Sequence, residues 1–251
     1  MQTGAITGYV DVAQLVLYAF WIFFAGLIYY LHRENKREGY PLESDRSRAI
    51  TVQGWPAVPE PKTFSLANGD TVQAPNARRD QQPPLHEGAY RGAPLQPEGD
   101  PLLAGVGPGS WADRADVADL TYEGVPKIVP LRAAPGFAVA HQDVDPRGLP
   151  VLGDDGAEGG RVVDLWVDRS EMLFRYLEVQ VASGARVLLP MNFARVRERH
   201  VLVKSLLSHQ FARVPATRSP EQVTLLEEEK IMAYYGAGTL YATPQRQEPL
   251  L

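Results

Sequence analysis

The sequence lacks cysteine altogether in its 251 residues. This absence excludes disulfides, thiolate metal ligands and a cysteine nucleophile, and it agrees with a cytoplasmic location for most of the chain. The five histidines are dispersed without an HExxH or similar ligand spacing, and the sequence contains neither a GxSxG elbow nor a Walker loop. We therefore predict that this chain alone binds no metal or cofactor.

An excess of basic residues is also missing. The chain has 25 lysines and arginines against 30 aspartates and glutamates, which gives a net charge of -5. These charges are spread along the sequence, so there is no basic stripe to hold a nucleic-acid backbone. Nucleic acid is therefore not a predicted partner.

Charged residues are absent from one long stretch, Val12 to Leu31. About twenty residues at 1.5 Å each cross the roughly 30 Å hydrocarbon core of a bilayer, so we predict a transmembrane helix over residues 12–31. A buried soluble helix would show a polar face, and a cleaved signal peptide would have a basic start and a cleavage site. Because basic residues follow the stretch at once, residues 1–11 are predicted outside and the remainder in the cytoplasm.

Residues 32–125 form a segment rich in proline and glycine. Of the chain's 21 prolines, 16 fall between Pro41 and Pro150, a density that excludes long helices and central strands. Large apolar residues recur through the segment, so we predict that it is extended and packs on a partner or on its own domain. Thr63 to Ala74 is a candidate hairpin around Asn68-Gly69. Gly105 to Ser110 is interpreted as a turn, because Pro108 removes an amide that phosphate binding would use.

Residues 126–251 show the alternation typical of β-strands. Short strands at this spacing indicate a small antiparallel barrel or sandwich in a mainly β domain. Thr224 and Glu227 form a candidate capping box for a short helix from Leu225 to Tyr235, which would end before Gly236. The candidate strands are Lys127 to Leu131, Gly136 to Ala140, Arg161 to Val167, Leu173 to Val181, Ala185 to Met191 and His200 to Ser205, and the candidate turns are Asp154 to Gly160, Asp168 to Ser170 and Ala182 to Gly184.

Five charged residues crowd one predicted hairpin, namely Asp164, Asp168, Glu171, Arg175 and Glu178. Carboxylates this close repel one another as anions, and covering them raises at least one pKa toward neutrality, as a proton relay requires. The alternative is a solvated acidic hairpin with Arg175 as counter-ion, and composition alone favours that alternative.

Seven strings spread over nearly the whole chain carry a family resemblance. They are YAFWIFFAGLIYYL (Tyr18–Leu31), ENKREGYPLE (Glu34–Glu43), GVGPGSW (Gly105–Trp111), DPRGLPV (Asp145–Val151), VVDLWVD (Val162–Asp168), LLPM (Leu188–Met191) and VTLLEEEKIMAYYGAG (Val223–Gly238). In these strings and in their order, the chain closely resembles the H subunit of the photosynthetic reaction centre of purple bacteria.

The resemblance implies one transmembrane helix and a cytoplasmic PRC-type barrel with a C-terminal helix. It implies a non-catalytic subunit that binds no pigment, caps the cytoplasmic face of the L and M subunits, stabilises the quinone and iron region, and assists proton transfer to the secondary quinone. The complex would contain bacteriochlorophyll, bacteriopheophytin, quinones, non-haem iron and carotenoid. It would lie in the bacterial inner, intracytoplasmic membrane, with residues 1–11 in the periplasm and a light-harvesting ring around it.

The resemblance also assigns roles to particular residues. Asp168, Glu171 and Arg175 match polar positions beneath the secondary quinone pocket, with Glu171 as a buried relay carboxylate or field-setting charge, Asp168 as the next acid outward and Arg175 balancing the charge. Several relatives carry an Asp-x-His-x-His surface cluster where protons are taken up, whereas this chain reads Thr121-Tyr122-Glu123-Gly124-Val125. Glu123 is therefore the candidate substitute as the surface acid.

Four residues near the membrane stretch match positions that approach lipids and the core subunits in the family. They are Tyr30, Lys36, Arg37 and Tyr40. Specific lipid-phosphate contact by Arg33, Lys36 and Arg37 is one interpretation, and ordinary positive-inside flanking of a helix is the other.

Two other classes of protein are alternatives. The first is a membrane-tethered hydrolase that uses two carboxylates of the acidic hairpin. The second is a free-standing PRC-barrel adaptor that binds another protein or a ribonucleoprotein. Neither alternative accounts for the reaction-centre-like helix and the proline-rich segment together.

Overall fold

The structure is a computed structural model that describes residues 4, 6, 11–43, 51–66, 69–76, 85–86 and 96–247, with only the backbone described at 85–86. The chain divides into two compact units, Met1–Gln81 and Gln82–Leu251. The division falls inside the proline-rich segment, and Leu102 and Val106 of that segment are buried in the second unit.

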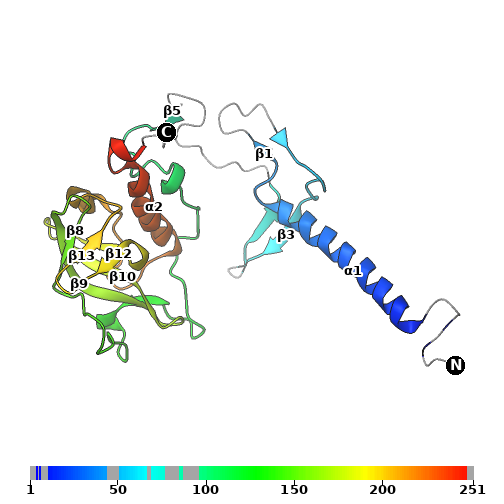
Figure 1. Ribbon diagram of the computed structural model, residues 1–251, viewed down its shortest axis with the longest axis horizontal. Helices are drawn as coiled ribbons and strands as arrows, with labels where there is room; N and C mark the ends of the chain where they lie inside the picture. The colour runs from blue at the N-terminus through cyan, green and yellow to red at the C-terminus, as the bar shows by residue number, and fades with distance from the viewer. Residues whose placement is uncertain are drawn as a thin grey trace. The chain divides into compact units, whose positions relative to one another are not determined.

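The first unit is built on helix α1 (Val12–Glu34), the long helix labelled in Figure 1. Asp11 caps it by accepting a hydrogen bond from the Gln14 backbone N–H at 2.8 Å. No residue of α1 is buried, although the helix is almost entirely apolar. Within the described residues, this is the one helix long and apolar enough to cross a membrane. The predicted helix is therefore confirmed, and it extends three residues beyond Leu31.

Short elements follow α1 in the first unit. The 3-10 helix η1 (Asn35–Arg37) continues it, and two antiparallel pairs come next, β1 (Leu42–Glu43) with β2 (Thr51–Val52) and β3 (Lys62–Ser65) with β4 (Thr71–Ala74). The pairing of β3 with β4 confirms the predicted hairpin. Asn68, which was expected at its turn, lies outside the described residues.

A seven-stranded sheet dominates the second unit and curls into a half-barrel. Its order is β11-β10-β9-β8-β13-β12, with β7 also paired to β9. All pairs are antiparallel except β8 with β13, which run parallel. The expectation of a purely antiparallel sheet is therefore wrong for this one pair. The strands are β7 (Ile128–Pro130), β8 (Pro150–Leu152), β9 (Glu158–Asp168), β10 (Leu173–Gln180), β11 (Arg186–Pro190), β12 (Ala194–Val196) and β13 (Val201–Val203). A separate short pair joins β5 (Leu85–His86) to β6 (Gln96–Pro97).

Five of the six predicted strands of this unit are confirmed in type and approximate position. The predicted strand Gly136 to Ala140 is wrong, because the Phe137 N–H closes a turn on the Ala134 carbonyl and Gly136 has φ 99°. The predicted turn Asp154 to Gly160 ends early, since β9 already begins at Glu158. Strands β8 and β12 were not predicted, and both are only three residues long.

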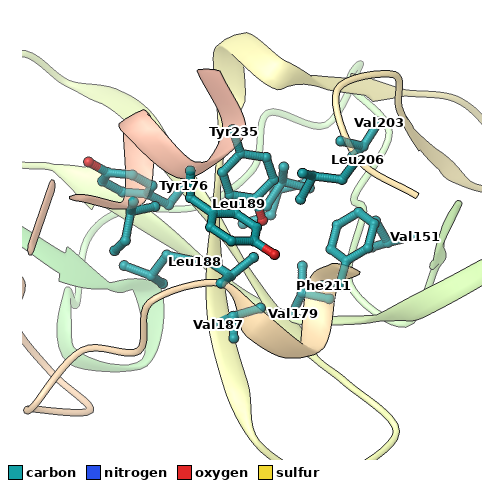
Figure 2. Close-up of a cluster of buried hydrophobic side chains, with 14 of the residues drawn as sticks. Val151, Tyr176, Val179, Val187, Leu188, Leu189, Val203, Leu206, Phe211 and Tyr235 are labelled. Atoms are coloured by element: carbon teal, nitrogen blue, oxygen red, sulfur yellow. The ribbon is translucent and has the colours of Figure 1, made fainter. Parts of the chain in front are cut away.

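Helix α2 (Leu225–Tyr241) packs on the sheet and completes the core. Figure 2 shows Tyr235 of this helix among Leu189, Leu206 and Phe211. The predicted capping box is present, because Thr224 and Glu227 each accept a hydrogen bond from the other's backbone N–H. The predicted end at Tyr235 is wrong, since the helix continues to Tyr241.

Two glycines let α2 continue past Tyr235 while lying against backbone. A Cβ on Gly236 would stand 2.4 Å from the Pro108 carbonyl oxygen, and one on Gly238 would stand 2.3 Å from the Ser205 carbonyl oxygen. The absence of a side chain at these two glycines therefore permits close packing of the helix on other segments of the chain, and it does not end the helix.

Further 3-10 helices are η2 (Gly107–Gly109), η3 (Leu131–Ala133), η4 (Met191–Phe193), η5 (Ser208–Arg213) and η6 (Pro244–Gln247).

The glycine-rich string is one of these 3-10 helices. In η2, the N–H groups of Gly109 and Ser110 donate to the carbonyls of Val106 and Gly107 at 2.9 and 3.1 Å. These amides are therefore used within the turn, and η2 lies against α2. The interpretation of this string as a turn is confirmed.

Candidate functional site

A hollow of about 740 Å³ lies on the second unit, between strands β7 and β10 and helix α2. It gathers acidic, basic and apolar side chains from parts of the chain that are far apart in sequence. Its lining includes Arg114, Asp119, Lys127, Asp168, Phe174, Arg175, Tyr176, Leu225, Glu228, Glu229 and Met232. Two of the predicted site residues, Asp168 and Arg175, are among them.

Asp168 is the most buried acid of the hollow, with 1% of its surface exposed. It ends strand β9, and one of its oxygens accepts the N–H groups of Ser170 and Glu171 at 3.0 and 2.9 Å. These bonds form the turn into β10 and hold the carboxylate in place. The other oxygen lies 3.4 Å from the Lys127 ammonium.

Lys127 lies at the centre of a group of charges that it forms with Asp168, Glu171 and Asp119. Its ammonium lies 3.2 Å from Glu171 and 3.7 Å from Asp119, in addition to its contact with Asp168. The bond to Glu171 raises the pKa of Lys127, burial opposes the rise, and the negative charge of Asp168 adds to it. A fixed positive charge therefore stands among three carboxylates.

Within this chain Glu171 is not the buried acid that was expected, because 51% of its side chain is exposed. The buried position belongs to Asp168. Sequence reasoning missed Lys127 as a site residue, although it opens a predicted strand. Lys127 is identified only by the pairing of β7 with β9 in the structure, because this pairing places the next residue, Ile128, opposite Asp168.

Arg175 lies at the hollow but away from this group. The register of β9 with β10 shifts between Phe174 and Tyr176, so Arg175 is an extra, bulged residue. Over the described ranges its guanidinium has no ion pair. Its charge acts instead on Glu228, whose pKa it lowers. The structure therefore separates Arg175 from the acids it was expected to balance.

Glu228 of α2 is a site residue that the sequence did not reveal. The Tyr176 hydroxyl donates to its carboxylate at 2.7 Å. Burial raises the pKa of Glu228, while the hydrogen bond from Tyr176 and the charge of Arg175 oppose the rise. Three glutamates are consecutive in α2, and only the packing of the helix on the sheet shows that Glu228 meets Tyr176.

The remaining two acids of the predicted hairpin form a second cluster. Asp164 and Glu178 lie opposite each other in β9 and β10, and both bind the Arg132 guanidinium. Glu178 also accepts from Trp166 and Arg186, each at 3.0 Å. The predicted single acidic hairpin is thus two separate groups, and this second one is fully paired.

Glu123 lies in an exposed turn, which the hydrogen bond from Thr121 N–H to the Val125 carbonyl closes at 2.8 Å. The neighbouring Thr121 side chain and the turn backbone keep the pKa of Glu123 below its ordinary value, and the charge of Arg169 adds to this effect. Arg169 immediately follows Asp168. Glu123 therefore lies within reach of the Arg169 charge but is not part of the hollow's lining.

The four predicted contact residues of the first unit surround the end of α1. Tyr30 is 53% exposed, with the Lys62 ammonium 5.9 Å from its ring centre. Arg37 donates to Glu34 and to the carbonyls of Glu60 and Ala74. Arg37 thus joins the helix end to the β3–β4 hairpin.

Lys36 is buried, with 3% of its surface exposed. Its ammonium donates to the carbonyls of Gln53 and Pro56, both at 2.6 Å, and lies 5.0 Å from the centre of the Tyr40 ring. In this structure the Lys36 charge is therefore used inside the first unit.

Comparison with known families agrees with this architecture. The model of the PRC-barrel domain matches residues 139–210, so the class of protein is a PRC-barrel protein that carries an N-terminal apolar helix. A second family model, for the H-chain N-terminal region of the photosynthetic reaction centre, matches residues 4–133, which is more than half of the chain. The chain belongs to the photosynthetic reaction centre H-chain family.

Family membership fixes the general role of the chain. It is a non-enzymatic accessory subunit of a photosynthetic reaction centre, so a hydrolase is excluded. The family implies association with the other reaction centre subunits in a complex with pigments and quinones, and the apolar helix fits a membrane protein. Among the residues that the structure describes, no group of three or more histidines or acids could hold a metal ion.

Proposed function

We propose that this H chain caps the cytoplasmic face of the L and M subunits and carries protons toward the secondary quinone that they hold. The observation that carries the proposal is that one hollow is lined both by the Asp168–Lys127 pair and by the Tyr176–Glu228 pair. Proton transfer between a surface and a buried acceptor needs a short series of ionisable groups with some protection from water. The hollow supplies such a series.

The groups divide this work by their surroundings. Glu171 is half-exposed, and the Lys127 charge attracts both it and Asp168. Glu228, whose pKa burial raises, holds a proton closer to neutral pH than an ordinary glutamate does. Arg175 sets the charge beside Glu228. Glu123 is the proposed surface acid for proton uptake.

The first unit has the anchoring role in this proposal. α1 spans the inner membrane with residues 1–11 in the periplasm, beside the core subunits and a light-harvesting ring. Tyr30 and Tyr40 contact lipid or the core subunits. Lys36 and Arg37 support those contacts by holding the chain at the helix end, because their donors are directed to backbone carbonyls and to Glu34.

The test is flash-induced proton uptake and second electron transfer to the secondary quinone in purified reaction centres. Glu171→Gln and Glu228→Gln are expected to slow both processes, with assembly and the first charge separation intact. Glu158→Gln is the matched control, since Glu158 is an exposed acid of β9 that pairs with Arg161 outside the hollow. Unchanged kinetics in both test variants would place the proton path in the partner subunits.

Glu123→Gln tests the surface acid separately. If Glu123 takes up protons for the hollow, this variant slows proton uptake at high pH, where free protons are scarce. Proton uptake identical to that of the wild type across pH would remove Glu123 from the path while leaving the role of the hollow intact.

A further inference from the structure

The loop from Gln53 to Pro56 is fixed to the end of α1 by a buried lysine. The Lys36 ammonium donates to the carbonyls at both ends of the loop, Gln53 and Pro56, at 2.6 Å each. Gly54 lies between them with φ 65°, and a Cβ there would stand 3.3 Å from the ammonium nitrogen. The ammonium therefore holds the loop closed, and Gly54 leaves room for it.

The fixed loop presents one large side chain outward. Trp55 is 77% exposed, although its two neighbours face the buried ammonium. Its ring contacts Tyr29 of α1, with ring centres 5.6 Å apart and planes at 50°. In the part of the chain that the structure describes, the indole N–H has no hydrogen-bond partner.

The contact with Tyr29 fixes the depth of Trp55 along the helix. Tyr29 lies two residues before Leu31, the last residue of the apolar run, which is about 3 Å along the axis at 1.5 Å per residue. A bilayer that covers the apolar run therefore reaches its headgroup boundary at this level. The loop returns the chain from the water-exposed side to that boundary.

We propose that Trp55 is an interfacial anchor that inserts into the phospholipid headgroup layer, held there by Lys36. An indole ring has an apolar body and one polar N–H, which suits the boundary between acyl chains and headgroups. Tyr29 and Tyr30 lie at the same level of the helix, and the exposed Arg33 follows one helical turn later. The proposal rests on the proposed membrane role of α1, and it assigns to Lys36 the positioning of Trp55 instead of direct contact with lipid.

The absence of cysteine from the chain makes the depth measurable. Trp55→Cys gives a single site for a nitroxide label in the full-length chain, reconstituted into vesicles of phosphatidylcholine and phosphatidylglycerol. Collision with oxygen reports lipid, and collision with a water-soluble nickel chelate reports water. Ile22→Cys in the middle of α1 is the lipid reference, and Tyr122→Cys, which is fully exposed in the second unit, is the water reference.

A label at position 55 is expected to show a depth between the two references, near the headgroups. A label at 55 as accessible to nickel as the label at 122 would overturn the proposal. A label at 55 that neither reagent reaches would also overturn it, because the site would then be covered by protein. If the label at 22 were in water, the membrane role of α1 itself would fail, which separates that failure from a failure of the loop.

Lys36→Met and Gly54→Ala, each added to Trp55→Cys, test the holding role. Both are expected to increase nickel accessibility at position 55 severalfold and to leave the labels at 22 and 122 unchanged. An unchanged depth in both would overturn the role of Lys36.

The natural side chain is tested by quenching of tryptophan fluorescence with brominated phospholipid. Wild type is expected to lose more fluorescence than Trp55→Phe, and equal losses would place the Trp55 indole outside the lipid.

Discussion

The hydrogen bond between Tyr176 and Glu228 can be removed with little change in packing. Tyr176→Phe keeps the ring, which is 2% exposed in the core (Figure 2), and deletes only the hydroxyl. The carboxylate of Glu228 then loses the donor at 2.7 Å and stays partly buried. A hydrogen bond to a charged group contributes about 1.5–3 kcal/mol and one between neutral groups about 1 kcal/mol. We therefore expect Tyr176→Phe to lower the free energy of unfolding by about 2 kcal/mol when Glu228 is ionised.

The pH dependence of this loss is the distinctive part of the prediction. Burial raises the pKa of Glu228 above its ordinary 4.5, and the Tyr176 hydroxyl opposes the rise. At about pH 8 the acid is charged and the lost bond is charge-assisted, whereas at about pH 4 it is protonated and the lost bond is between neutral groups. The cost of Tyr176→Phe should thus fall from about 2 to about 1 kcal/mol on acidification.

The assay is urea unfolding of the full chain in detergent micelles, followed by near-ultraviolet circular dichroism at both pH values. Tyr234→Phe is the matched control, because the equally buried Tyr234 hydroxyl donates at 2.8 Å to the neutral carbonyl of Gln210. Its cost should be about 1 kcal/mol and independent of pH. Equal costs for the two variants at both pH values would refute the assigned charge of Glu228.

Three further outcomes are expected from the same unfolding assay. Because the folded state binds the Glu228 proton more tightly than the unfolded state does, wild type should lose stability as pH rises from 4.5 through the raised pKa of Glu228. Glu228→Gln should abolish this loss. Burial alone would raise the pKa of Asp155, but hydrogen bonds from the Ser208 side chain and N–H lower it. The wild type should therefore lose stability as pH falls through the lowered pKa, and Asp155→Asn should remove that pH dependence, which solvent screening at this exposed site keeps small. Gly236→Ala should cost about 2 kcal/mol or more, because its Cβ would meet the Pro108 carbonyl at 2.4 Å, although alanine ordinarily favours a helix; a stabilised variant would contradict this packing.

Much of the fold follows from local patterns in the sequence. The uncharged run predicts α1, the Thr224 capping box predicts the start of α2, and alternation predicts the long strands, because each of these depends on neighbours in sequence. The end of α2 was not predictable in this way. Gly236 would end an isolated helix, but here it permits a close approach to Pro108, which only the tertiary structure reveals.

The site was predictable only in part. The acids of the hairpin are evident in the sequence, and Asp168 does lie in the hollow. Their separation into two groups depends on Arg132 and Lys127, which reach them from η3 and from the residue before β7. The role of Glu228 depends on how α2 packs against β10. Partners that come from distant segments leave no local pattern.

The position of α2 in the chain has a consequence for biosynthesis. All strands of the sheet precede α2, yet its Ile231, Tyr234 and Tyr235 are among the most buried residues of the second unit. During translation, α1 leaves the ribosome long before these residues of α2 are synthesised. Until then, the face of the sheet that α2 covers has no helix packed on it. The apolar helix, which is long enough to cross a membrane, is therefore complete before the core of the second unit can close.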